Sequence, residues 1–292
     1  MDGSNEVALL RSVCRLGSCP LPPKAVRLAL ELAGDDNLSD EAIIVQVESD
    51  EKLRLGLLIV ANLSIFCGGR AAKTVRQAVA QIGRRKCLSA LWLLALSDFL
   101  RSWKPLHERP REKLWRHLLL AGVLAQKLQV AARLENPGEG LAAGMAHDIG
   151  HVLLAGPAPR LGIIWHEEHD QLIERNLSPA PERDHCRLGA ALLGFWNAPG
   201  ELIASALDHH DPASAPAAHR PLVAAVRLAD LLAEHLDLDR PAYPLHLESA
   251  RAWQEAAALE PWNKVPDLER LAIEQLPDAL AISEHVANAL SD

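Results

Sequence analysis

GLAAGMAHDIGH, residues 140–151, is the stretch from which the fold and the chemistry of this sequence can be worked out. It is apolar up to the adjacent pair His147-Asp148 and then reaches a glycine, a pattern that predicts a buried helix ending at that pair. With 13 histidines in the chain, about one His-Asp dipeptide is expected by chance, and there are three. The pair at 147 is therefore informative only if the surrounding helices bring further polar groups to it.

The segments on both sides of residues 140–151 also have a helical pattern. Their apolar residues recur at spacings of three and four, and alternating strand-like runs are absent. We therefore expect an all-α, multi-helix protein. The predicted helices span residues 24–33, 39–48, 51–66, 74–82, 85–103, 111–134, 139–147, 159–175, 182–196, 201–209, 221–236, 246–259 and 266–289.

Two prolines suggest how the helices are grouped. Pro105 and Pro110 interrupt the helical pattern, because proline lacks a backbone N–H and clashes with the preceding turn of a helix. We predict an N-terminal helical lobe over residues 16–105 and a second, histidine-bearing lobe over residues 106–236. Residues 237–292 form a C-terminal helical extension in this division.

The charge balance argues against a nucleic-acid partner. The chain has 30 Lys and Arg against 38 Asp and Glu, a net charge of −8 that opposes binding to phosphate backbones and anionic membranes. The one compact basic group is Arg84, Arg85 and Lys86, with Arg76 upstream on the same helical pattern. We interpret this group as a solvated helix face.

Membrane and secretion signals are also missing from the pattern. The longest apolar stretch, residues 88–100, is too short to cross a bilayer, and the first 30 residues lack the apolar core of a secretory signal. The five cysteines are scattered without a C-x-x-C pair, which excludes a disulfide framework and a zinc ribbon. We expect a cytoplasmic protein that does not span a membrane.

Several histidines and one further aspartate lie on the apolar faces or at the ends of the predicted helices. His117, His185 and Asp230 share a helix face with apolar residues, and His209 and His210 close a helix. A single histidine on such a face is more often a hydrogen-bonded core residue. A buried, unpaired carboxylate, however, costs several kcal/mol. Together with His147 and Asp148, these residues favour one dinuclear metal centre.

The motifs that carry these residues resemble a known superfamily. In chain order they are LWRH (114–117), GMAHDIGH (144–151), DHCRLGAALLGFW (184–196), LDHHDP (207–212) and VRLAD (226–230). They look like the HD superfamily of metal-dependent phosphohydrolases. The N-terminal stretches LPPKAVRLALEL (21–32), LSDEAIIVQVESDEKLRLGLLIVANLS (38–64) and TVRQAVAQIGRRKCLSALW (74–92) narrow the resemblance to its HDOD branch, the HD-related output domain. The resemblance covers roughly residues 16–236.

The resemblance implies a helical HD-type bundle with two metal ions. One ion would be held by His117, His147, Asp148 and Asp230, and the other by Asp148, His185, His209 and His210. Asp148 would bridge, since a carboxylate has two oxygens that can reach two ions. Imidazole and carboxylate ligands together suit a divalent transition metal, and the sequence does not distinguish Fe, Mn, Co, Ni and Zn.

The resemblance leaves two functions open. Active relatives continue the His-Asp pair as HD-x-G-K, but the lysine position here is His151, and DPASAPAAHRPL (211–222) replaces the GYP segment of cyclic-dinucleotide phosphodiesterases. Lys113 also stands where a carboxylate for a third metal would be needed. The first function is an HDOD-type signalling protein that acts through a protein partner or a nucleotide. The alternative is an active metal-dependent phosphohydrolase on a nucleotide or phosphate ester, with Asp148 and His151 as catalytic residues.

Overall fold

The described part of the chain is all-helical apart from one small hairpin. The computed structural model describes residues 24–25, 27–29, 39–63, 71–102, 108–134, 139–154, 163–166, 171–174, 184–237 and 250–290. Its elements are α3 (Asp40–Glu48), α4 (Glu51–Ala61), α5 (Val75–Ser102), α6 (Glu108–Ala131), α7 (Gly140–Ala146), α8 (His151–Leu154), β1 (Ile163–His166), β2 (Gln171–Glu174), α9 (Asp184–Phe195), α10 (Gly200–Asp208), η2 (Pro212–Ser214), α11 (Arg220–Asp237), α12 (Arg251–Ala257), η4 (Trp262–Lys264) and α13 (Leu268–Ala289). The all-α prediction is confirmed.

Local sequence signals explain where the first helices begin. The side chain of Ser39 accepts a hydrogen bond from the backbone N–H of Ala42 at 3.3 Å, and that of Asp50 accepts one from Leu53 at 3.0 Å. Both residues are N-caps, which satisfy N–H groups that have no partner within the helix. The predicted starts at 39 and 51 therefore agree with α3 and α4 to within one residue.

The break predicted between residues 82 and 85 is a kink within one helix. α5 continues through it, and Gly83 alone has non-helical backbone angles, φ 76° and ψ 162°. Glycine adopts a positive φ without steric cost. Pro110 lies in the first turn of α6, where its missing N–H removes no helical hydrogen bond. The predicted helix start at 111 is thus late, and Pro105 lies outside the described residues.

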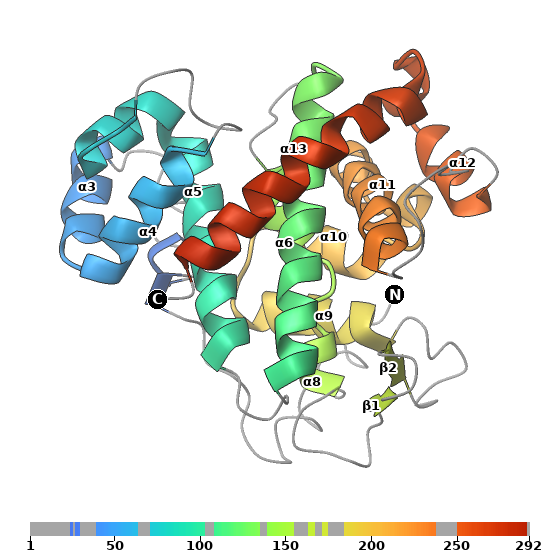
Figure 1. The fold of residues 1–292 in the computed structure, drawn as a ribbon, viewed down its shortest axis with the longest axis horizontal. Helices are drawn as coiled ribbons and strands as arrows, with labels where there is room; N and C mark the ends of the chain where they lie inside the picture. The colour runs from blue at the N-terminus through green and yellow to red at the C-terminus, as the bar shows by residue number, and fades with distance from the viewer. Residues whose placement is uncertain are drawn as a thin grey trace.

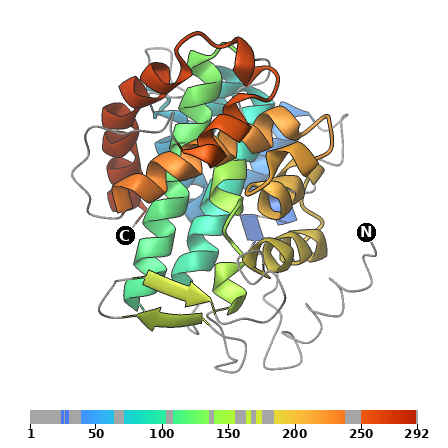
Figure 2. The ribbon, with the colours of Figure 1, turned by 90° about the vertical axis from the view of Figure 1, so that its right-hand side faces the viewer.

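The helix predicted over residues 159–175 is wrong. This region contains β1 and β2, an antiparallel pair in which Ile163 is opposite Glu174 and His166 is opposite Gln171. The first strand reads IIWH, which is rich in the β-branched and aromatic residues that favour strands, and the second reads QLIE. Figures 1 and 2 place this hairpin at the end of the bundle where α6 begins.

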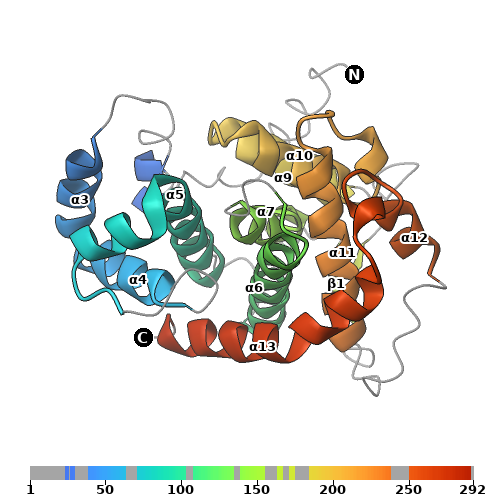
Figure 3. The same cartoon turned by 90° about the horizontal axis from the view of Figure 1, so that it is seen from above.

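α6 is the central helix, and the C-terminal extension packs against it. α6 contacts α7, α11 and α13, while α5 contacts α3 and α4 on one side and α6 and α7 on the other. Figures 1 and 3 show α13 crossing α6 and ending beside α4, and an ion pair between Lys127 and Asp278 joins α13 to α6. One apolar cluster runs through all three predicted parts, from Ala25 to Ala287. None of the helices in the described ranges is both long and apolar enough to cross a bilayer.

The turn after α7 lies directly against α9. A Cβ placed on Gly150 would be 1.9 Å from the carbonyl oxygen of His185 and 2.7 Å from the backbone nitrogen of Gly189. Only glycine fits this approach, because real Cβ atoms do not come so close to backbone atoms. The contact brings the His147-Asp148 pair next to His185.

Candidate metal centre

Five helices bring the seven predicted ligand residues together. His117 comes from α6, His147 from the end of α7, Asp148 from the turn after it, His185 from the first turn of α9, His209 and His210 from the end of α10, and Asp230 from α11. The side chains of His147, His209 and Asp230 are at most 2% exposed. The structure thus places all seven in one buried pocket.

Asp148 is the centre of this pocket. Its Oδ1 lies 3.2 Å from His185 Nε2 and 3.3 Å from His209 Nε2. Its Oδ2 faces the other side, 3.6 Å from His147 Nε2 and 3.9 Å from His117 Nε2. The two oxygens of one carboxylate therefore face two different groups of imidazoles, which is the arrangement a bridging ligand requires.

Asp230 completes the group on the Oδ2 side. Its Oδ1 lies 3.3 Å from His117 Nε2 and 3.4 Å from His147 Nε2. Its Oδ2 accepts a hydrogen bond from Arg227 at 2.6 Å, so that only one oxygen remains for the imidazoles. We did not predict Arg227 from the sequence, although its position three residues before Asp230 puts both side chains on one helix face. Such an outer partner fixes the orientation of a ligating carboxylate.

The group on the Oδ1 side contains a thiol as well as imidazoles. His185 Nε2 is 3.4 Å from His209 Nε2, 3.1 Å from His210 Nε2 and 3.3 Å from Cys186 Sγ. The sequence alone makes a catalytic Cys-His pair of these two residues unlikely, because adjacent helix residues point about 100° apart. The structure nevertheless brings both side chains to the pocket, since both residues lie in the first turn of α9.

Backbone carbonyls orient two of the rings. His147 Nδ1 donates to the carbonyl of Gly144 at 2.6 Å, and His209 Nδ1 is 3.1 Å from that of Ser205 and 3.2 Å from that of Ala206. A proton held on Nδ1 leaves Nε2 as the nitrogen that can bind a metal. In both rings Nε2 is the atom that faces Asp148.

The residues present fit the metal that the sequence implied. His147 Nε2 and Asp148 Oδ1 are buried and form no hydrogen bond with any residue the structure describes. A buried polar atom without a partner costs about 1–3 kcal/mol, and a cation on each side of the Asp148 carboxylate would remove that cost for both atoms. Five imidazoles with two carboxylates match a first-row transition metal better than Mg²⁺ or Ca²⁺, which prefer oxygen ligands.

Without a metal, the facing charges shift the pKa values of the cluster strongly. Burial alone would raise the pKa of Asp148, but the imidazoles of His147, His151 and His185 outweigh it and hold that pKa well below its usual range. In the same way, the nearby imidazoles of His117 and His147 outweigh burial and hold the pKa of Asp230 well below its usual range.

The neighbouring histidines His209 and His210 shift in opposite directions. Burial lowers the pKa of His209, but the nearby carboxylate of Asp148 and the sulfur of Cys186 outweigh it and raise that pKa to about 10. Burial, together with the charges of His209 and Arg227, lowers the pKa of His210 to about 3. The metal-free pocket therefore holds a proton on one of the two adjacent rings and not on the other.

The shift of His209 predicts that the metal-free protein loses stability as the pH rises above 6.5. The stabilisation from His209, with a folded pKa of about 10, is complete below pH 6.5 and is lost as the pH rises toward 10. On the acid side two shifts oppose each other. His210, with a folded pKa of about 3, favours folding above pH 6.5, whereas burial raises the pKa of Glu234 to about 7, which costs stability as the pH rises from 4.5 to 7. The low pKa values of the two carboxylates reduce stability below about pH 4.

Urea unfolding of the chelated protein between pH 4 and 8 measures this effect. The free energy of unfolding should fall as the pH rises from 6.5 to 8, by up to about 1.4 kcal/mol per pH unit for one proton. In the metal-loaded protein, the free energy of unfolding should no longer fall as the pH rises above 6.5, because an ion bound to His209 replaces the proton. A free energy that rises between pH 6.5 and 8 in the chelated protein would contradict the shift of His209.

His151, which the sequence suggested as a catalytic residue, also faces Asp148. It is the first residue of α8, and its Nε2 lies 3.4 Å from Asp148 Oδ2. Its ring stacks on that of His185, with centroids 4.3 Å apart and planes inclined by 14°. His151 therefore lies at the edge of the cluster, in contact with both of its halves.

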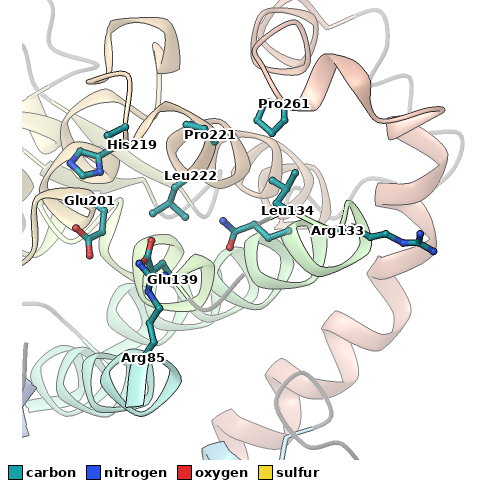
Figure 4. Close-up of a pocket in the computed structure, with 11 residues that line it drawn as sticks. Arg85, Arg133, Leu134, Glu139, Glu201, His219, Pro221, Leu222 and Pro261 are labelled. Carbon is teal, nitrogen blue, oxygen red and sulfur yellow. The ribbon is translucent and has the colours of Figure 1, made fainter. Parts of the chain in front are cut away.

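A separate cavity of about 670 Å³ lies at the other end of α7, away from the cluster. Figure 4 shows Arg85 of α5 reaching Glu139, just before α7, with Glu201 and His219 beside them. Arg85 and Glu139 form an ion pair of 2.6 Å. Burial raises the pKa of Glu139, and the charge of Arg85 opposes that shift. No residue lining this cavity belongs to the seven ligands.

In a comparison with known families, the model of the HDOD domain matches residues 19–212. Six of the seven ligand residues lie in this range, and Asp230 follows it. Among curated proteins, an uncharacterized protein of Treponema pallidum is 26% identical over 229 residues, which are 76% of this chain and 43% of that protein. The chain thus spans less than half the length of this relative.

Solved structures show the same fold. An HDOD domain protein of unknown function from Geobacter sulfurreducens superposes with a TM-score of 0.75, at 22% identity over 99% of both chains. A proposed metal-dependent phosphohydrolase from Shewanella amazonensis gives a TM-score of 0.66, at 18% identity over 99% of this chain and 100% of that one. A proposed signal transduction protein from Marinobacter aquaeolei gives 0.60, at 19% identity over 98% of this chain and 66% of that one.

Proposed function

Because this chain belongs to the HDOD domain family, we propose that it is a regulatory signalling protein whose pocket holds two divalent transition-metal ions. One observation carries the proposal: two groups of imidazoles face the two oxygens of Asp148. His117, His147 and Asp230 would hold one ion, His185, His209 and His210 the other, and Asp148 would bridge them.

The proposed partner is another protein or a nucleotide, in the cytoplasm. An apolar cavity of about 1020 Å³ between α4, α5 and the end of α13, which the half-exposed Leu55 helps to line, supports protein contacts.

The basic residues of α5 give no support for nucleic-acid binding, since Arg76 pairs with Glu41 at 2.7 Å and Arg85 with Glu139. We also keep, as part of this proposal, the predicted division of the chain into an N-terminal lobe (16–105), a histidine-bearing lobe (106–236) and a C-terminal extension (237–292).

Metal analysis and activity assays together test the proposal. Protein purified from metal-replete medium is expected to contain two transition-metal ions per chain. It should turn over no nucleotide or phosphate ester in a panel assayed with added Mn²⁺ or Fe²⁺. Protein without bound metal after this purification would overturn the proposal, and steady turnover would replace it with the second candidate below.

The second candidate is a metal-dependent phosphohydrolase, which the complete ligand set favours. When bound, such a pair of ions supplies Lewis acidity toward a phosphoryl group and acidifies water. In this candidate Asp148 positions both ions, and His151 donates a hydrogen bond to a phosphate oxygen of the substrate. Turnover that disappears in Asp148→Ala while the helical circular dichroism is kept would establish it. Turnover that survives in that variant would exclude this pocket as its source.

A further inference from the structure

Cys186 is a donor atom of the pocket that the metal-ligand motifs do not include. Its Sγ lies 3.3 Å from His185 Nε2 and 4.0 Å from His209 Nδ1, and the residue is 1% exposed. The sulfur and one nitrogen from each of His185, His209 and His210 all lie within 4.8 Å of one another. A buried cysteine usually contacts apolar side chains. The sulfur of Cys186 lies instead among the ring nitrogens of three histidines.

The surroundings of Cys186 favour a thiolate. The residue is in the first turn of α9, a helix of 12 residues, where the partial positive charge of the N-terminus stabilises an anion. Cys186 Sγ also faces ring nitrogens of His185 and His209, at 3.3 Å and 4.0 Å. Cys87, the other buried cysteine among the described residues, lies within α5 in the apolar core instead.

We propose that Cys186 is a thiolate ligand of the ion on the Oδ1 side of Asp148, together with His185, His209 and His210. This inference rests on the proposed function, because it requires an ion in that half of the pocket. The orphaned Asp148 Oδ1, which faces the same histidines, is independent evidence that a cation belongs there.

A sulfur ligand makes the two halves of the pocket chemically different. The half with Asp230 offers two carboxylates and two imidazoles, which suit Mn²⁺ or Fe²⁺. The half with Cys186 offers a thiolate and three imidazoles beside one shared carboxylate, which suit Zn²⁺ or Co²⁺ and disfavour Mn²⁺ and Mg²⁺. The two halves of the pocket should therefore prefer different metals, and a zinc or cobalt ion should bind in the half that contains Cys186.

Cobalt spectroscopy tests the sulfur ligand without relying on activity. Full-length protein freed of metal is titrated with Co²⁺, and a thiolate-to-cobalt charge-transfer band in the near ultraviolet should grow with one of the two ions. Cys87→Ser, the matched control, should keep the band. Cys186→Ser should lose it, and the affinity for one ion should fall by more than about 100-fold, which exceeds the 10–100-fold loss expected for an outer partner. The other ion should bind as in the wild type.

Each alternative outcome is decisive. Wild-type protein that binds two cobalt ions without this band would overturn the role of Cys186 and leave the proposed two-metal function intact. Protein that binds no cobalt would overturn both. If Cys186→Ser does not fold, X-ray absorption of zinc-loaded wild type decides instead, since a sulfur ligand lies about 2.3 Å from zinc. A zinc shell of nitrogen and oxygen only would refute the proposal.

Discussion

Asp148→Ala is expected to remove both metal ions, whereas Asp230→Asn is expected to remove only one. Asp148 presents Oδ1 to His185 and His209 and Oδ2 to His117 and His147, so both halves of the pocket lose a ligand and a negative charge. Loss of an outer-shell partner alone reduces metal affinity about 10–100-fold, and the loss of a bridging ligand should exceed 100-fold for each ion.

Asp230→Asn is the matched control for this prediction. Asp230 lies near His117 and His147 on the Oδ2 side, so the ion near His185 should remain. Isothermal titration with Zn²⁺ or Co²⁺ gives the number of sites and their affinities. Melting temperatures give an independent readout, because a metal that binds only the folded chain raises them. If Asp148→Ala kept one ion at wild-type affinity, Asp148 would not be the bridge.

Gly150→Ala is expected to destabilise the protein by about 3 kcal/mol or more. Its Cβ would overlap the carbonyl oxygen of His185 at 1.9 Å and approach the nitrogen of Gly189 at 2.7 Å, and both obstacles are backbone atoms. Overpacking a tight contact costs about 1–3 kcal/mol, and the cost rises when no flexible side chain can move away. The turn holding Asp148 would separate from His185, so metal affinity should fall as well.

Gly194→Ala in α9, the helix against which Gly150 packs, is the control for Gly150→Ala. No atom lies within 4 Å of a Cβ at that position, and glycine within a helix costs about 0.5–1 kcal/mol relative to alanine. Gly194→Ala should therefore be stabilised slightly, with unchanged metal binding. Denaturant unfolding with and without chelator measures both variants. Equal stabilities of Gly150→Ala and the wild type would mean that the turn after α7 does not lie against α9 in solution.

Most of the helices could be predicted because their apolar faces follow a helical period, and the β-hairpin could not. α11 illustrates the first case, since Val223, Val226 and Asp230 fall on the face that is buried. The strands at 163–166 and 171–174 illustrate the second. Apolar runs of this length do not distinguish a strand from a short buried helix by periodicity alone.

The ligand residues of the candidate site could be predicted, but two of their neighbours could not. Histidine and aspartate on apolar faces stand out, because such side chains are rarely buried without a partner. Arg227 looks like any solvated cation until its hydrogen bond to Asp230 is known. Cys186 follows His185 directly, and only its position in the first turn of α9 shows that both side chains reach the pocket.

The order of the ligands along the chain determines when the pocket can be completed during synthesis. His117 is on α6 and Asp230 on α11, so the ligands are distributed over positions 117–230. A nascent chain emerges from the ribosome N-terminus first, and contacts between distant positions form after local ones. When α6 and α7 have emerged, their imidazoles still lack the carboxylate and the arginine that α11 supplies. A pocket that holds both of the proposed ions therefore marks a chain that has been translated at least through α11 and has packed it against α6.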